Sequence, residues 1–228
     1  MLSLCRRSFI KIIFLGLAMT SSNGLATEYG KGIVKAKELI LEKKTSERST
    51  IGSKTSEKEW KSFKFKDEGF AIDLPTIPAH SKQTIEIPQS NLIITYDTYV
   101  SELNEDAVYV VSVWEYPNQI DMSSPEINLQ EGFSGMLSAL PESQILLMKA
   151  KENQGFKALE FWVKNEEIFF KGELISAGNK LYQLFVVYKD NESKDSVDYP
   201  KFISSFKLMK EPSKSKATNW KKVFLKTS

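Results

Sequence analysis

The stretch from Gly155 to Tyr188 constrains the fold of this chain more than any other. It contains three apolar runs of strand length, rich in aromatic and β-branched residues, which are separated at residues 165–167 and 177–179. The separators read Asn-Glu-Glu and Ala-Gly-Asn, which are typical turn compositions between strands. The sequence therefore predicts a three-stranded antiparallel meander over this stretch.

The residues around this meander complete one predicted α+β domain over residues 60–208. Further strands are predicted at 62–67, 70–75, 80–87, 91–100, 107–116 and 143–151. Apolar residues at helical spacing between Pro125 and Pro141 predict a helix that lies on the sheet, and a second, shorter helix is expected to begin near Pro200. Because the strands do not alternate with helices, we predict an antiparallel sheet of about six to nine strands covered by two helices.

The N-terminal segment, residues 1–26, has the composition of a signal peptide. Two arginines precede a short apolar run, and Gly24-Leu25-Ala26 offers small residues at the cleavage positions. The alternative is an uncleaved membrane anchor, but Lys11 leaves the apolar run well short of the ~20 residues of a spanning helix. We expect export to the periplasm or the extracellular space, with cleavage after Ala26.

Removal of residues 1–26 would leave a nearly neutral protein without a thiol. The chain has 31 basic and 29 acidic residues, and 28 of the basic ones would remain, for a net charge of −1. A neutral surface gives no general attraction for nucleic acid, so we expect no nucleic-acid partner. The only cysteine, Cys5, lies before the apolar run, so it cannot serve as a lipid-modified cysteine, a nucleophile or a metal ligand in the mature chain.

Two polar segments flank the predicted domain. Residues 27–59 are rich in Lys, Glu, Ser and Thr, which indicates a linker, with one short helix expected within residues 31–44. Residues 209–228 form a basic tail. If the tail is helical, Trp220, Lys221, Lys222 and Phe224 would form a short basic amphipathic patch for an anionic membrane surface or an acidic partner.

The sequence offers few residues for catalysis or metal binding. It contains one histidine, His80, which follows a proline at the start of a predicted strand and which we interpret as a solvated surface residue. A hydrolase triad or a zinc site needs further partners of defined types, and no glycine-rich phosphate loop is present. We therefore expect no metal and no cofactor, and the pattern argues against an enzyme.

Two glutamates, Glu160 and Glu173, interrupt apolar strands of the meander. On the solvent face they would form weak cross-strand ion pairs, whereas inward burial beside a groove would make them candidates for catalysis or ligand binding. Strand periodicity does not distinguish these cases, because a bulge of one residue reverses the facing. Aromatic residues of the strands, with Trp114 and Trp162 as candidates, could line such a groove, but the favoured interpretation places most strand aromatics in the core.

Residues 60–208 resemble the Mog1/PsbP-like α/β/α family. The resemblance lies in the order of elements, in an opening strand that ends in proline (residues 69–75, with Pro78), and in a closing helix that ends in Ser-Phe (residues 202–206). It implies an α/β/α sandwich and a non-catalytic binding or assembly module, without shared catalytic residues.

Three functional hypotheses follow. The first is an exported, non-catalytic accessory or binding module of the bacterial cell envelope, whose partner is another envelope protein. The second is a hydrolase or ligand-processing enzyme that uses Glu160 and Glu173 in a groove on the sheet. The third is a scaffold that binds the membrane surface through the basic tail. The facing of the two glutamates separates the first two hypotheses.

Overall fold

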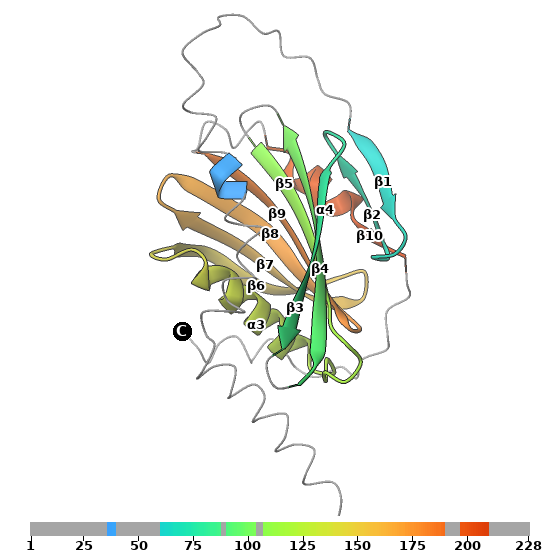
Figure 1. Cartoon of the computed structure of the whole chain (residues 1–228). Helices are drawn as coiled ribbons and strands as arrows, with labels where there is room; N and C mark the ends of the chain where they lie inside the picture. Colours follow the sequence, from blue (N-terminus) through green and yellow to red (C-terminus); the bar gives the residue numbers. More distant parts are fainter. Residues whose placement is uncertain (1–35, 40–59, 88–89, 104–106, 190–196, 210–228) are drawn as a thin grey trace, which may run out of the picture.

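A computed structural model describes most of the domain predicted from the sequence (Figure 1). The described residues are 36–39, 60–87, 90–103, 107–189 and 197–209. The predicted signal peptide, most of the polar linker and the basic tail lie outside them.

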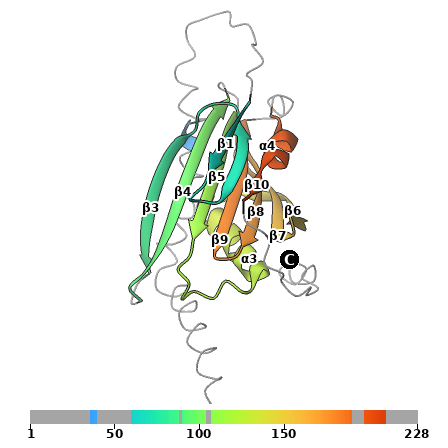
Figure 2. The same cartoon turned by 90° about the vertical axis from the view of Figure 1, so that its right-hand side faces the viewer.

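A seven-stranded antiparallel sheet forms the centre of the molecule, in the order β3-β4-β5-β9-β8-β7-β6. Its strands are β3 (Ala79–Ile87), β4 (Leu92–Leu103), β5 (Ala107–Glu115), β6 (Gln144–Asn153), β7 (Phe156–Asn165), β8 (Ile168–Ala177) and β9 (Lys180–Lys189). The predicted meander is present as β7, β8 and β9, with its turns at the two predicted separators. Figure 2 shows β3 and β6 as the two edge strands at opposite sides of the sheet.

A second, three-stranded sheet covers part of one face of the large sheet. It consists of β1 (Lys61–Phe65), β2 (Phe70–Leu74) and β10 (Lys207–Leu208), with β2 in the middle. The predicted antiparallel α+β class is confirmed, but β1 and β2 do not continue the main sheet as expected. The pairing of β2 with a two-residue strand after the last helix has no signal in the sequence, because so short a strand shows no periodicity.

Helices α3 and α4 pack on opposite faces of the large sheet (Figure 1). Helix α3 (Pro125–Ser138) lies on β7, β8 and β9, and it buries Leu129, Phe133 and Met136. Helix α4 (Tyr199–Ser205) packs on β2 and β8 and buries Phe202. These contacts make the layers of an α/β/α sandwich, and we call the two faces of the sheet the α3 face and the α4 face.

Each face has its own core. On the α3 face the core is mainly aliphatic and phenylalanine-rich, whereas on the α4 face several buried tyrosines pack between the large sheet, the small sheet and α4. The hydroxyl of Tyr109 accepts from the Asp198 backbone N–H at 3.2 Å, and that of Tyr182 donates to the Glu68 carbonyl at 2.8 Å. The phenol groups therefore connect the large sheet to the elements that cover it.

Close packing inside the sheet requires glycine at one position. A Cβ atom added to Gly172 of β8 would lie 2.3 Å from the Leu184 carbonyl oxygen and 2.6 Å from ring or Cβ atoms of Phe161 and Phe185. Gly69 and Gly178 serve the turns instead, with φ values of 79° and 65° that favour glycine.

A short part of the predicted linker belongs to the domain. Residues 36–39 are helical, Ala36 is fully buried in the core of the α3 face, and Lys37 Nζ donates to Asn165 Oδ1 at 2.6 Å. The expected spacer therefore includes at least one turn that packs on the sheet.

Candidate functional site

The edge strand β6 exposes an unusual amount of apolar surface. Four consecutive residues, Ile145, Leu146, Leu147 and Met148, are 47%, 38%, 36% and 38% exposed. Half of the eight large hydrophobic residues that are exposed in the described part of the chain lie in this one run. Isolated exposed hydrophobics are normal in proteins, but a contiguous run on a sheet edge is typical of an interaction surface or a site of aggregation.

The run reaches both faces of the sheet because β6 is covered on neither. Ile145 pairs with Val163 and Met148 with Phe161, whose side chains belong to the core of the α3 face, whereas Leu147 pairs with Trp162 on the α4 face. The register shifts between Ile145 and Leu147, so Leu146 is the extra residue of a β-bulge. Beyond this bulge, β6 is regular from Leu147 to Asn153.

Glu160 and Glu173 lie together on the α4 face. They are direct partners in the β7–β8 ladder, and Lys149 of β6 is the partner of Glu160 on its other side. The two carboxylate-bearing side chains thus point the same way, as an enzyme would need, but their environments differ. Glu173 is fully buried and Glu160 is half-buried.

Partners on β6 hold the carboxylate of Glu173. Its Oε1 accepts from Asn153 Nδ2 at 2.8 Å, and its Oε2 forms an ion pair with Lys151 Nζ at 3.0 Å. Both partners reach across β7, where Lys151 is opposite Ala158, a small and fully buried residue, and Asn153 is opposite Phe156. Glu173 therefore binds the edge strand to the interior of the sheet, which is a structural role that the expected alternatives did not include.

Aromatic rings and lysines alternate beside the two glutamates. Lys171 Nζ lies 4.5 Å from the ring centroid of Tyr199 and 5.6 Å from that of Trp162, while Lys164 Nζ lies 5.6 Å from the centroid of Phe169. These distances are typical of cation–π interactions. Burial, with Glu160 and Glu173 nearby, raises the pKa of Tyr199, so its hydroxyl stays protonated at neutral pH and donates to the Gly172 carbonyl at 3.3 Å.

The other predicted site residues do not join this group. Trp114 is 1% exposed on the opposite, α3 face, where its ring stacks on Tyr96 at 4.4 Å between centroids. Trp114 and Trp162 therefore lie on opposite faces of the sheet and do not line one groove. Trp220, Lys221, Lys222 and Phe224 lie outside the described residues.

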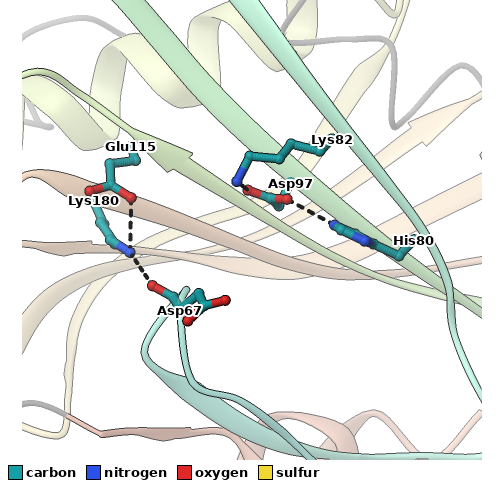
Figure 3. Close-up of polar contacts among 6 residues, drawn as sticks. All are labelled: Asp67, His80, Lys82, Asp97, Glu115 and Lys180. Atoms are coloured by element: carbon teal, nitrogen blue, oxygen red, sulfur yellow. Dashed lines mark hydrogen bonds and ion pairs between the residues drawn. The ribbon is translucent and has the colours of Figure 1, made fainter.

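A second polar cluster lies on the same α4 face but at the opposite edge of the sheet, around His80, which the sequence analysis interpreted as a solvated residue (Figure 3). His80 Nε2 lies 2.8 Å from Asp97 Oδ1, and Lys82 Nζ lies 3.3 Å from Asp97 Oδ2. Asp97 is buried, and the His80 ring stacks on Tyr99 at 4.5 Å between centroids. The carboxylate partner of His80 and Lys82 comes from the neighbouring strand β4, so it could not be identified without the strand register.

Lys180 forms a neighbouring contact that ties three elements together (Figure 3). Its Nζ lies 3.0 Å from Glu115 Oε2 and donates to the Asp67 carbonyl at 3.1 Å. Because Asp67 belongs to the β1–β2 turn, this lysine fastens the small sheet to β5 and β9. None of these polar residues presents an activated nucleophile, so the arrangement suits structure and recognition better than covalent catalysis.

A candidate metal centre and a membrane-spanning helix are both absent from the residues that the structure describes. Among them, no group of three or more His, Cys, Asp or Glu side chains is placed to hold a metal ion. No helix within the described ranges has the length and apolar character needed to cross a bilayer.

Comparison with known proteins adds little beyond the fold. No family model and no curated protein matches the sequence. Among solved structures, the chain is similar to cyanobacterial PsbP from Synechocystis, with a TM-score of 0.42 and 13% identity, over 71% of this chain and 98% of that one. It is also similar to a protein of unknown function from Pseudomonas aeruginosa, with a TM-score of 0.29 and 5% identity, over 60% of this chain and 87% of that one. At these values neither likeness indicates what the chain binds, and membership of the PsbP-like family stays a prediction.

Proposed function

We propose that this protein is an exported, non-catalytic binding module of the bacterial cell envelope and that it binds another envelope protein through β6. The observation that carries the proposal is the exposed run Ile145–Met148 on a sheet edge that no other described strand covers. An edge strand presents a row of unpaired backbone N–H and C=O groups, so a partner strand can add to it by main-chain hydrogen bonds.

The placement of the glutamates favours this function over the hydrolase. Both oxygens of Glu173 already contact β6, so this carboxylate is occupied by a structural interaction. Glu160 alone would have to supply acid–base chemistry, whereas glycoside hydrolysis, for example, uses two available carboxyl groups. The module also agrees with the predicted signal peptide over residues 1–26, which would deliver the domain to the envelope.

The binding surface can be tested by site-specific photo-crosslinking in cells of the organism of origin. A photoreactive phenylalanine analogue at Leu146 should give one discrete crosslinked product, because this side chain lies on the exposed edge. The matched control is Ile77, which is 80% exposed and lies outside the strands. Random collisions should therefore label Ile77 more strongly than Leu146. Equal, diffuse labelling at both positions would contradict a binding site on β6.

Export is tested separately by fractionation and mass spectrometry. The mature protein should be found outside the cytoplasm and should begin at Thr27. A chain that retains residues 1–26 in the membrane fraction would instead support the anchor.

A further inference from the structure

We infer that the partner bound at β6 is an extended polypeptide segment that carries carboxylate side chains and adds to the sheet as an eighth strand. This inference rests on the proposed function and specifies the chemistry of the partner. Its basis is the charge of the α4 face around β6, together with the facing of the exposed side chains.

Lysines dominate the α4 face of β6, β7 and β8. Lys149, Lys151, Lys164 and Lys171 lie there against only two carboxylates, Glu160 and Glu173. Lys151 is paired with Glu173, whereas Lys149, Lys164 and Lys171 form no ion pair within the described ranges. An incoming strand with acidic residues on this face would therefore gain attraction from unpaired cations.

Among these lysines, Lys149 would lie directly beside a strand added to β6. Its side chain is exposed, and it belongs to the regular part of β6 that begins after the bulge at Leu146. On a strand paired with Leu147–Asn153, side chains on the α4 face would lie beside Leu147, Lys149 and Lys151. We therefore expect an apolar residue beside Leu147 and an acidic residue two positions along the partner, beside Lys149.

Two other occupants are disfavoured by the same charges. The chain's own residues 210–228 contain six lysines and one glutamate, so they would be repelled by Lys149. A second copy of the chain, paired through β6, would bring another Lys149 and another Lys151 to the same face. The β6 strand of that copy would contribute no carboxylate on this face to neutralise them. A carboxylate-bearing strand from a different protein avoids both problems.

The test uses the full-length mature protein and three synthetic peptides, with binding measured by fluorescence anisotropy. The first peptide alternates valine with glutamate, the second alternates valine with lysine, and the third is the first peptide with every backbone nitrogen methylated, which removes the hydrogen-bond donors of both strand edges. We expect only the first to bind, with an affinity that falls as salt is added. Binding of the methylated peptide would overturn strand addition, and equal binding of the lysine peptide would overturn the charge preference.

Charge reversal on the protein gives the matched control. Lys149→Glu should weaken binding of the glutamate peptide about tenfold and improve binding of the lysine peptide. Lys64→Glu, at an exposed lysine of β1 on the other sheet, should change neither. Circular dichroism of both variants establishes that the fold is intact.

The failure of this inference is distinguishable from the failure of the proposed function. A discrete crosslink at Leu146 together with no peptide binding would leave β6 as the interface and reject an acidic strand. A crosslink whose product is a dimer of this chain, weakened by dilution, would reject the acidic partner in favour of a second copy.

Discussion

The two edges of the seven-stranded sheet are anchored in the same way but expose different side chains. At one edge, buried Asp97 of β4 holds His80 and Lys82 of β3, and at the other, buried Glu173 of β8 holds Lys151 and Asn153 of β6. Both carboxylates lie on the α4 face. The anchoring of an edge strand is therefore independent of what the strand presents to the outside.

The exposed side chains distinguish a protected edge from an open one. Strand β3 carries Lys82 and Glu86 among exposed polar residues, which is the usual protection of an edge against pairing with other chains. Strand β6 carries Ile145–Met148 instead, and only the bulge at Leu146 interrupts its pairing. Under the proposed function, β3 stays unpaired, whereas β6 accepts a partner.

The largest effect is expected from alkaline pH, which acts on the α4 face that both anchors share. Burial raises the pKa of Tyr109 and Tyr182 far above the ordinary value of about 10. The two tyrosines therefore leave the free energy of unfolding unchanged below pH ~10 and lower it at higher pH, because the unfolded state releases phenol protons that the folded state retains. Each tyrosine should remove about 1.4 kcal/mol per pH unit.

Denaturant titrations between about pH 9 and 12, roughly the range in which free tyrosine ionises, measure this loss, with the ultraviolet absorbance of phenolate as the record of ionisation. Tyr109→Phe should make the decline shallower by about one proton. An unchanged slope in that variant would mean that Tyr109 ionises in the folded protein as readily as in the unfolded one.

Removal of the β6 anchor should have the largest effect among single substitutions. Glu173→Ala leaves Asn153 and Lys151 without their partner and opens space in a fully buried position, so we expect a loss of about 3 kcal/mol. Hydrogen exchange should accelerate in β6 and not in β3. Equal acceleration in both strands would show that Glu173 supports the whole sheet rather than its edge.

The corresponding substitution at the β3 edge should lower the free energy of unfolding by a smaller amount. Asp97→Ala removes contacts to His80 and Lys82, whose side chains are 45% and 59% exposed and can be solvated after the change. We expect a loss of about 1 kcal/mol, measured in the same denaturant titrations. A loss as large as that of Glu173→Ala would contradict the idea that exposure of the partners sets the difference.

A buried polar residue between the two edges offers a substitution that we expect to raise, rather than lower, the free energy of unfolding. Gln183 of β9 is 1% exposed, and its Nε2 makes no hydrogen bond within the part of the chain that the structure describes. Gln183→Met keeps the volume and removes the desolvated amide, so stability should increase by about 1 kcal/mol. Destabilisation in thermal unfolding would show that the amide has a partner in solution, such as a bound water.

The smallest effect on stability is expected from converting the protected edge into an open one. Lys82→Leu should change the free energy of unfolding by about 1 kcal/mol or less, because the lysine is more than half exposed. Light scattering should nevertheless show concentration-dependent association, which Leu147→Lys should not produce. The absence of association would mean that Lys82 does not protect β3.

Local sequence patterns determined the elements of this fold. The composition of the turns at 165–167 and 177–179 marked the meander, and the apolar spacing between Pro125 and Pro141 marked α3, since turn chemistry and helical periodicity depend on neighbouring residues only. The α+β class followed from the order of these elements. The missed strand β10 pairs with β2 across more than 130 residues, which leaves no local pattern. The hairpin of β1 and β2 is local, but its separation from the large sheet depends on contacts with distant elements.

Only the tertiary structure decided which polar residues meet. The sequence singled out Glu160 and Glu173, but their shared face and the contacts of Glu173 with β6 depend on register, and the facing of a strand reverses with a single bulge. For the same reason the sequence could not show that Trp114 and Trp162 lie on opposite faces of the sheet, or that His80 contacts Asp97. The sequence identified candidate residues by their type, whereas strand pairing determined which residues contact one another.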